Sequence, residues 1–322
     1  MSAKEPSLEV IVRKKSEIAN NIFLFELSRL DGAALPACEP GSHIAVETPC
    51  GANRWYSICN VSEDNRSYFI AVKRESAGRG GSISMADDAQ EGCSLRIGEP
   101  ECEFEFVNAD RYLFIAGGIG ITPIYAMWKH LVEIAHPHFK LIYLTRSPAD
   151  TPFLEAFLHS PMKDNVLIHH TGEAGARFDF WDLLAKPTTQ HIYCCGPKTL
   201  MTEIKDMTGH WPSSRLHFED FKPVEAVRVD DKPFRARLAG SDTVIEVNEH
   251  ETLLDALRKR GIRIHSSCES GTCGSCKIAF VNGSVDHRDL VLEETEREST
   301  MMACVSRAEG DEITIDVRGA IQ

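Results

Sequence analysis

Residues 268–276 read CESGTCGSC, and one further cysteine, Cys304, follows after 27 intervening residues. The spacing C-x4-C-x2-C with a distant fourth cysteine is typical of a plant-type [2Fe–2S] centre. Two ferric ions need four thiolates, so we expect the loop to supply three, with Cys304 as the fourth ligand. Glycines between the cysteines let the backbone curl closely around the cluster, because glycine tolerates positive φ. The predicted ligands are Cys268, Cys273, Cys276 and Cys304.

Two other readings of these cysteines are weaker. A structural zinc site could use Cys273 and Cys276, but zinc favours paired cysteine knuckles and Cys304 has no second cysteine beside it. A thioredoxin-like redox pair would leave Cys268 and Cys304 unexplained. An iron–sulfur cluster accounts for all four residues.

The segment around this loop, residues 225–322, is predicted to form a third unit that contains both helix and strands. FRARLAGSDTVIEV is typical of a hairpin, and TLLDALRKRG of an amphipathic helix that ends at Gly261. KIAFVNGSV and ITIDV are expected to be strands. The charged, proline-flanked stretch KPVEAVRVDDKP is a candidate linker to the preceding segment.

Residues 109–224 alternate continuous apolar runs with helical patterns, which predicts a parallel sheet wrapped by crossover helices. The run RYLFIAGG leads into Gly117-Gly118-Ile119-Gly120-Ile121-Thr122-Pro123, which opens a helix. Glycines at such a position let a pyrophosphate approach backbone N–H groups. Alone, the motif also suits an ordinary tight turn between a strand and a helix.

A second element, Cys195-Gly196-Pro197, also follows a strand and precedes a helix. Parallel strands end at the same edge of a sheet, so we expect both elements to lie side by side where ligands bind. The pair therefore predicts a nucleotide site.

Residues 1–108 alternate apolar and polar positions in short runs, which is typical of an antiparallel β-barrel. This segment contains Arg54-Trp55-Tyr56-Ser57 and the glycine-rich turn GRGGS at 78–82. The arginine, the serine and the aromatic hydroxyl suit a flat anionic cofactor, and the turn suits a phosphate. Each element alone could be an ordinary strand or loop. The turn is expected to continue through a short loop toward SISMADDAQEG.

Composition limits the class of protein. The 322 residues carry a formal net charge of −13, against the basic excess expected of a nucleic-acid binder. No apolar run approaches the roughly 18 residues that suggest a membrane-spanning helix, and the N-terminal stretch MSAKEPSLEV lacks the apolar core of a signal peptide. We expect a cytoplasmic protein with no membrane or nucleic-acid partner.

The order of barrel, nucleotide domain and ferredoxin domain, with RxYS, GGIGITP, CGP, HFEDF, CESGTCGSCK and DHRDLVL, resembles the phthalate dioxygenase reductase family over essentially the whole chain. The resemblance implies a flavin domain that binds FMN in residues 1–108, a second domain that binds NADH in residues 109–224 and, in residues 225–322, an α+β plant-type ferredoxin domain of the β-grasp type that binds the cluster. The implied FMN contacts are Arg54, Tyr56, Ser57, Ala71, Val72, Lys73, Gly80, Gly81, Ser82 and Thr122. The implied NADH contacts are Gly118, Gly120, Cys195, Gly196 and Pro197, with Phe221 beside the isoalloxazine. Trp55 departs from the motif and is expected to point away from the flavin.

The resemblance also implies the path of electrons, from NADH through FMN and the cluster to a Rieske-type aromatic-ring oxygenase. FMN is favoured over FAD because no aromatic platform for an adenine is evident after the glycine-rich turn. For the nucleotide, Arg146 is a candidate cation for a 2′-phosphate, whereas Asp150 would oppose one, so the sequence favours NADH. No catalytic acid or base is assigned, since hydride transfer needs none.

Three alternatives stay open: a reductase for an aromatic O-demethylase or another oxygenase, a general NADH diaphorase, and a non-enzymatic iron–sulfur sensor. The cluster domain carries 13 basic and 19 acidic residues, which could pair with a basic patch on the acceptor.

Overall fold

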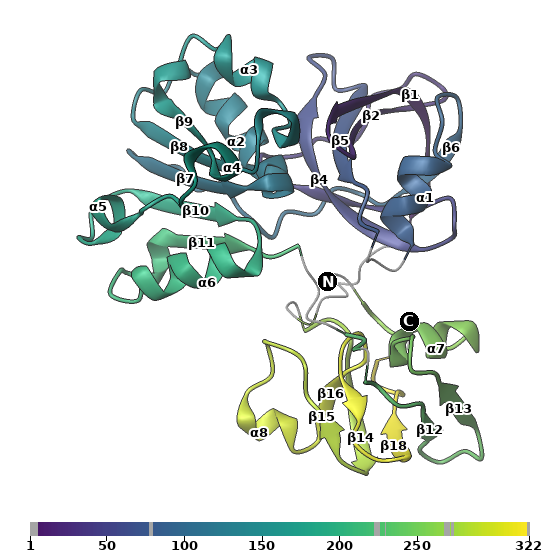
Figure 1. The fold of residues 1–322 in the computed structure, drawn as a ribbon. Coiled ribbons are helices and arrows are strands. Elements are labelled where there is room, and N and C mark those ends of the chain that lie inside the picture. The colour runs from purple at the N-terminus through teal and green to yellow at the C-terminus, as the bar shows by residue number, and fades with distance from the viewer. Residues whose placement is uncertain are drawn as a thin grey trace. The chain divides into compact units, whose positions relative to one another are not determined.

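The computed structural model describes residues 6–76, 80–221, 226–228, 230–266, 271 and 274–320. The chain divides into two compact units, Lys4–Asp220 and a second formed mainly by Phe221–Gln322 (Figure 1). The first unit contains both the barrel and the parallel sheet predicted from the sequence. Within the described ranges, no helix is both long and apolar enough to cross a membrane.

Six antiparallel strands form a closed barrel in the order β1-β2-β5-β4-β3-β6, which closes because β6 pairs with both β1 and β3. Alternation is clear on the first strand, where Val10 and Val12 are fully buried while Glu9 and Arg13 are exposed. The predicted barrel is therefore confirmed. Its strands are β1 (Leu8–Ala19), β2 (Ile22–Arg29), β3 (His43–Glu47), β4 (Asn53–Val61), β5 (Ser67–Lys73) and β6 (Ser94–Ile97).

The stretch after the glycine-rich turn differs from the prediction. It forms helix α1 (Gly81–Asp87) rather than a loop. Met85 of this helix is fully buried in the barrel core, and Ala89 beyond its end joins the same core. Packing of this apolar face stabilises a helix that is too short to form on propensity alone. The glycine and serine residues of this stretch are weak helix formers, so its sequence did not indicate a helix.

Five parallel strands form the second sheet in the order β11-β10-β7-β8-β9. The central strand β7 is buried at all six positions, as its continuous apolar run predicted. The strands are β7 (Tyr112–Gly117), β8 (Phe139–Thr145), β9 (Val166–His170), β10 (His191–Cys195) and β11 (Leu216–Glu219). The α-helices are α2 (Ile121–Glu133), α3 (Leu154–Leu158), α4 (Thr171–Ala174), α5 (Trp181–Leu184) and α6 (Lys198–Met207), with 3₁₀ turns η1 (Gly118–Gly120), η2 (Pro148–Asp150), η3 (Lys163–Asn165) and η4 (Ser213–Arg215).

Strand order places a switch point between β7 and β10. The chain leaves β7 toward β8 and leaves β10 toward β11, so the two connections diverge and open a crevice at the carboxyl ends of these strands. Helix α2, which follows β7, also packs against β4 of the barrel. The nucleotide sheet and the barrel therefore meet beside this crevice.

The second unit has the mixed sheet expected of a ferredoxin domain, in the order β13-β12-β18-β14-β16. The predicted hairpin is the antiparallel pair β12–β13, and helix α7 begins with a capping box between Thr252 and Asp255. Gly261 follows this helix at a φ of 74°, as expected of a terminating glycine. The elements are β12 (Phe234–Leu238), β13 (Val244–Val247), α7 (Leu253–Lys259), β14 (Lys277–Asn282), β15 (Val285–Asp286), α8 (Glu294–Arg297), β16 (Thr300–Met302), β17 (Arg307–Ala308) and β18 (Glu312–Asp316).

Candidate functional site: a cleft between barrel and sheet, and a cysteine centre

Strand β4 presents buried polar atoms that have no partner in the described part of the chain. They are the Tyr56 hydroxyl, the Ser57 hydroxyl and Oδ1 of Asn53. Burial raises the pKa of Tyr56, so its phenol stays protonated and can donate a hydrogen bond. Buried polar groups in folded proteins are nearly always paired, so three on one strand indicate a polar ligand that pairs with them. The sequence did not mark Asn53 as a site residue. Its unpaired buried oxygen is the signal that identifies it.

Arg54 and the glycine-rich turn lie against each other. A Cβ on Gly81 would come within 2.8 Å of both Cγ and Nε of Arg54, so any other residue there would displace the arginine side chain. Gly80 has a φ of 84°, and the backbone N–H of Glu75 donates to Ser82 Oγ at 3.2 Å. Ser82 of the turn therefore bonds to Glu75, just after β5, and Gly81 lies beside Arg54, which the sequence assigned to an anionic cofactor. Gly78 and Arg79 lie outside the described residues.

The other predicted flavin contacts differ in their exposure. Val72 is buried in the barrel core, so only its backbone is available to a ligand, whereas Lys73 is exposed and lines the cavity described below. Thr122 is buried at the start of α2 and donates its hydroxyl to the Ile119 carbonyl at 3.0 Å. The Trp55 ring lies edge-on to His43 at 4.7 Å between ring centroids.

The two glycine elements of the parallel sheet touch, as the sequence predicted. A Cβ on Gly196 would lie 3.0 Å from both N and Cα of Gly117, and a Cβ on Gly117 would lie 2.6 Å from Pro197 Cδ. A Cβ on Gly120 would clash with the carbonyl of Cys195 and lie 2.7 Å from the Gly196 nitrogen. The absence of side chains lets the two strand ends approach, and it exposes backbone at the switch point.

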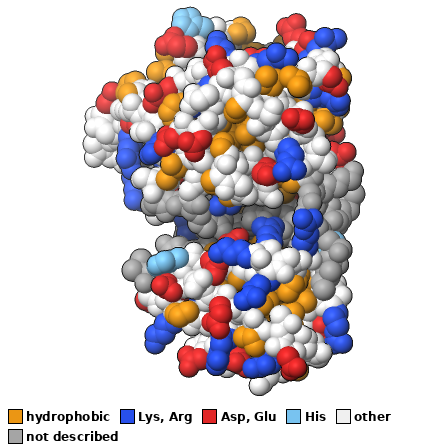
Figure 2. Space-filling model, turned by 90° about the vertical axis from the view of Figure 1, so that its right-hand side faces the viewer, with side chains coloured by type: hydrophobic (Ala, Val, Ile, Leu, Met, Phe, Trp, Pro, Cys, Tyr) orange, Lys and Arg blue, Asp and Glu red, His pale blue; other side chains and the backbone are white. Residues whose placement is uncertain are grey.

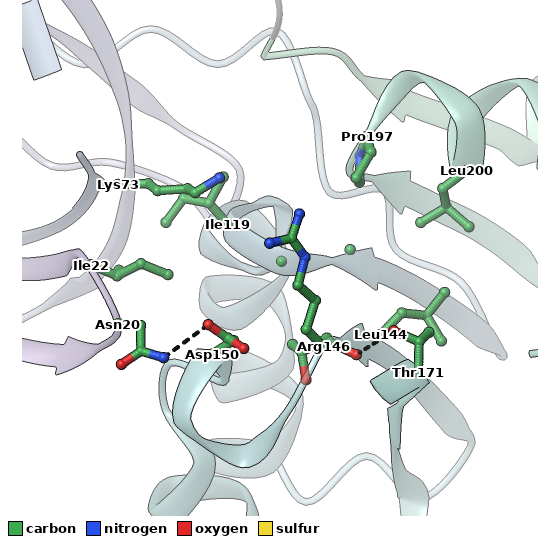
Figure 3. Close-up of a pocket in the computed structure, with 13 residues that line it drawn as sticks. Asn20, Ile22, Lys73, Ile119, Leu144, Arg146, Asp150, Thr171, Pro197 and Leu200 are labelled. Atoms are coloured by element: carbon green, nitrogen blue, oxygen red, sulfur yellow. Dashed lines mark hydrogen bonds between the residues drawn. The ribbon is translucent and has the colours of Figure 1, made fainter. Parts of the chain in front are cut away.

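A cavity of about 300 Å³ opens beside these glycines, between the sheet and the barrel (Figure 3). Three groups of residues line it. The glycine side supplies Gly117, Gly118, Ile119, Pro197 and Leu200; the neighbouring strand ends supply Leu144, Thr145, Arg146, Asp150 and Thr171; and the barrel supplies Asn20, Ile22 and Lys73. The sequence predicted some of these residues but not Asn20, Ile22 or Leu200, because no local motif marks a residue that reaches the cavity from another element.

The cavity lining combines charge with apolar surface. Asp150 accepts hydrogen bonds from Ser147 Oγ at 2.7 Å and from Asn20 Nδ2 at 3.1 Å, and these bonds lower the pKa of its carboxyl. Leu144, Ile119 and Leu200 supply apolar walls. An elongated ligand with rings and phosphates fits this mixture.

Glu219 lies at the end of β11, opposite Cys195 in the register of β10 and β11. Its Oε2 is buried and has no partner within the described segments. Burial, with a contribution from the charge of Glu103, raises the pKa of Glu219 to about 8. Burial also raises the pKa of Cys195 well above its ordinary value, so this thiol is neutral and is no nucleophile. Glu219 and Cys195 therefore add no charge beside the crevice at neutral pH.

Two of the four predicted cluster ligands are described, and they lie at the same end of one strand pair. Cys276 directly precedes β14 and Cys304 closely follows β16; these strands are antiparallel neighbours, and Ala303 N–H donates to the Cys276 carbonyl at 3.1 Å. Both cysteines are 1% exposed. Cys268 and Cys273 lie outside the described residues. Two buried thiols at one end of a sheet suit a soft metal centre.

The glycines of the cysteine loop have the backbone that the sequence predicted. Gly271 and Gly274 have φ angles of 76° and 80°. A Cβ on Gly271 would lie 2.8 Å from Val305 Cγ2, and the Gly271 carbonyl accepts a hydrogen bond from Leu290 N–H at 3.0 Å. The run DHRDLVL therefore supports the loop. Phe221 is 39% exposed and begins the second unit, so its position beside a flavin stays a prediction.

Comparison with known proteins agrees with this geometry. Residues 236–309 match the family model of the 2Fe-2S iron-sulfur cluster binding domain. The chain is 45% identical to the phthalate 4,5-dioxygenase oxygenase reductase subunit of Pseudomonas putida over 94% of each chain. It is 33% identical to the vanillate O-demethylase oxidoreductase of a Pseudomonas species, covering 96% of this chain and 100% of the relative. A solved structure of phthalate dioxygenase reductase, described as modular for electron transfer from pyridine nucleotides to [2Fe–2S], superposes with a TM-score of 0.88 at 43% identity, covering 96% of this chain and 97% of the other.

Gly120→Ala tests the crevice. We expect it to destabilise the first unit by about 1–3 kcal/mol, because the new methyl group must displace the backbone of Cys195 and Gly196. Gly209→Ala is the matched control, since its Cβ would have no neighbour closer than 3.8 Å. Thermal unfolding followed by circular dichroism measures both variants. Equal stability of the two would contradict the close approach.

Glu219→Gln tests the buried acid. Between pH values of about 4.5 and 8 the folded chain retains the Glu219 proton that the unfolded chain releases. The free energy of unfolding therefore falls as pH rises through this window, and the glutamine variant lacks this component of the fall. Denaturation in urea at about pH 5 and about pH 8 should show a stability advantage of the variant that grows with pH. An advantage independent of pH would count against a protonated Glu219.

Proposed function

Because this chain belongs to the phthalate dioxygenase reductase family, we propose that it oxidises NADH and delivers the electrons, through FMN and a [2Fe–2S] cluster, to a Rieske-type oxygenase in the cytoplasm. The observation that carries the proposal is the cleft of the first unit. One wall is the glycine crevice of a parallel sheet and the other comes from the barrel, so a nucleotide and a flavin can meet there.

The flavin side is supported by the fit of β4. Tyr56 and Ser57 have buried hydroxyls available for ring oxygens and nitrogens, and Arg54 supplies positive charge beside Gly81. Ala71, Lys73, Gly80, Ser82 and Thr122 complete the proposed contacts, with Val72 contributing backbone alone. Between β5 and β6 the described chain forms only the seven-residue helix α1, and no aromatic residue lies on that helix to stack on an adenine. FMN therefore suits the site better than FAD.

The nucleotide side is supported by Gly118, Gly120, Gly196 and Pro197, whose small or flat shapes leave room for a nicotinamide near the barrel. Cys195 is buried and neutral, so it packs rather than reacts. These residues orient the nucleotide and exclude water, which is the protein's main contribution to hydride transfer. A bound flavin accepts electrons in pairs and releases them singly, which matches NADH to a one-electron cluster. Phe221 is proposed as the residue beside the flavin ring.

Cys276 and Cys304, at one end of the β14–β16 pair, would hold the cluster together with Cys268 and Cys273 of the loop. The nine cysteines that the structure describes form no disulfide bonds. We propose the domain limits 1–108, 109–224 and 225–322 for the flavin, nucleotide and cluster parts.

The acceptor is proposed to be an oxygenase because the relatives named above are reductases of oxygenase or demethylase systems. A phthalate-type ring dioxygenase is the first choice, and an O-demethylase of an aromatic acid is the second, favoured by the vanillate O-demethylase relative. A panel of purified oxygenase components, each tested for NADH-dependent turnover, distinguishes the two.

The surface of the second unit supports docking by charge. Glu293, Glu294 and Glu298 are exposed on and beside α8, and Leu290, which bonds to Gly271 of the cysteine loop, lies only three residues before Glu293. On the face drawn in Figure 2, acidic and basic side chains are interspersed. The acidic group near the cluster loop is thus the candidate contact for a basic acceptor.

The pigments of the purified chain test the proposal directly. We expect flavin and iron–sulfur absorption that bleaches when NADH is added without oxygen, and FMN as the flavin released on denaturation. Cys304→Ser should remove the cluster bands and transfer to the oxygenase but keep NADH oxidation by ferricyanide. Cys50→Ser, an exposed cysteine on the barrel, is the control. Physiological turnover that survives Cys304→Ser would favour a diaphorase, and the absence of any bleaching would overturn the proposal.

Ionic strength tests the docking charge. Raising salt should slow electron transfer to the oxygenase but not ferricyanide reduction, because screening weakens contacts between charged surfaces. Glu294→Gln should lower the oxygenase rate by about threefold at low salt and little at high salt. Asp242→Asn, an exposed acid on the β12–β13 turn, should leave the rate unchanged. Equal slowing of both acceptors by salt would refute charge-assisted docking.

A further inference from the structure

We propose that Arg288 attaches the linker between the two units to the cluster unit, and that this attachment sets the rate at which an electron passes from the proposed flavin to the proposed cluster. The linker is the stretch KPVEAVRVDDKP, residues 222–233. The inference rests on the proposed function and adds Arg288 as a positioning residue, which none of the predicted cofactor contacts includes.

One arginine side chain bonds to the linker at two points. Arg288 Nη1 donates to the Ala226 carbonyl at 3.0 Å and to Asp231 Oδ2 at 2.9 Å, and Arg288 Nη2 donates to Asp231 Oδ1 at 2.6 Å. Paired bonds of this kind between a guanidinium and a carboxylate are strong and directional. Ala226 is also buried in the hydrophobic core of the cluster unit. Residues 222–225 and Val229 lie outside the described residues.

The pair formed by Arg288 and Asp231 is buried, with side chains that are only 4% and 5% exposed. Burial alone would raise the pKa of Asp231, but bonds from Arg288 and from the Arg228 N–H hold that pKa below its ordinary value, so the carboxylate is ionised at neutral pH. Asp286 Oδ2 also accepts from Arg288, at 2.7 Å from Nε. Loss of Arg288 would therefore deprive both carboxylates of the arginine that they share, which favours release of the linker.

The residue after Arg288 supports the cysteine loop. Asp289 is fully buried, and its Oδ2 accepts from Leu292 N–H at 2.8 Å. A Cβ on Gly271 would lie 3.3 Å from Asp289 Cα, and Leu290 N–H donates to the Gly271 carbonyl at 3.0 Å. Because Arg288 and Asp289 are adjacent, one short stretch of backbone contacts the cysteine loop and carries the bonds to the linker. The linker is thus attached at the cluster end of its unit.

Arg288 also decides where the chain that leaves the first unit is first attached to the cluster unit. Five residues separate Asp220, the last residue of the first unit, from Ala226. Among the described residues, the next buried attachment is the ion pair of Asp231 with Arg307, at 3.5 Å between Oδ2 and Nε. Ten residues separate Asp220 from Asp231.

Loss of Arg288 should therefore double the length of the connecting chain. The remaining pair of Arg228 with Asp286, at 3.6 Å, is largely exposed and contributes little to holding the linker. The effective concentration of one tethered partner at the other falls roughly as the −3/2 power of tether length. A doubled tether would make productive encounters of the two cofactor sites about threefold rarer.

Arg288→Ala tests this role. We expect the transfer of one electron from reduced flavin to oxidised cluster to slow about threefold, measured by stopped-flow absorbance after NADH is added without oxygen. Ferricyanide reduction and the reduction potential of the cluster should not change, since neither depends on the tether. Arg318→Ala is the matched control, because Arg318 also pairs with an aspartate, Asp316 at 2.6 Å, but is itself exposed. A shift in the cluster potential that accounts for the slowing would overturn the inference.

An insertion separates tether length from other effects of the substitution. Gly-Ser-Gly-Ser-Gly placed between Pro223 and Val224 also doubles the connection but leaves Arg288 in place. This variant should slow the same transfer by about threefold, and its combination with Arg288→Ala by about fivefold. Should Arg288→Ala not assemble a cluster, Arg288→Lys carries the test, because lysine keeps the charge but cannot make the paired bonds, and a smaller slowing is expected.

Hydrogen exchange followed by mass spectrometry gives a readout that does not depend on turnover. Peptides that cover residues 226–231 should exchange faster in Arg288→Ala than in the wild-type chain, whereas the insertion should leave their exchange unchanged. Unchanged exchange in Arg288→Ala, or an unchanged transfer rate in either variant, would overturn the inference. Failure of NADH to bleach the wild-type chain would instead overturn the proposed function.

Discussion

Close approach of two strand ends, at Gly117 and Gly196, is the constraint on which the cleft depends. With a side chain at either position, the carboxyl ends of β7 and β10 could not lie as near as they do. The approach leaves bare backbone at the switch point of the sheet and lets Pro197 and Leu200 form one wall of the cavity. Ligands of such sheets bind at the carboxyl ends of the strands, at the switch point. The site therefore depends on the absence of Cβ atoms at Gly117 and Gly196.

Contact between barrel and sheet gives the cleft its second wall. Helix α2 packs against β4, and Asn20 bonds to Ala149 and Asp150 across the boundary. These contacts combine two folds, each of which could bind only part of a redox pair, into one cavity. The Asn20 bond holds the Asp150 carboxylate in the lining of the cavity, which Arg146 also lines.

Electron transfer requires different environments for the two ends of the path. The cleft combines apolar walls with the charged side chains of Lys73, Arg146 and Asp150. Burial raises the pKa values of Glu219 and Cys195, so these two groups add no charge beside the crevice at neutral pH. The cysteine end is built from thiols that are soft ligands, on a loop curled by glycines at positive φ. The acidic residues Glu293, Glu294 and Glu298 are exposed on and beside α8 of the second unit.

Most features that the sequence predicted correctly depend on residues that are close together in the chain. The alternating barrel, the buried run of β7, the hairpin, Gly261 after α7 and the meeting of the two glycine elements were all confirmed, because each follows from periodicity or backbone sterics within a few residues. The cysteine spacing predicted an iron–sulfur domain, and the family model and the relatives agree with that prediction. Tertiary structure alone decided the rest. Helix α1 forms because Met85 reaches the barrel core, Asn53 is marked only by its unpaired oxygen, and Asn20 reaches Asp150 from 130 residues away. Burial and long-range contact depend on the whole chain, so no window of sequence contains them.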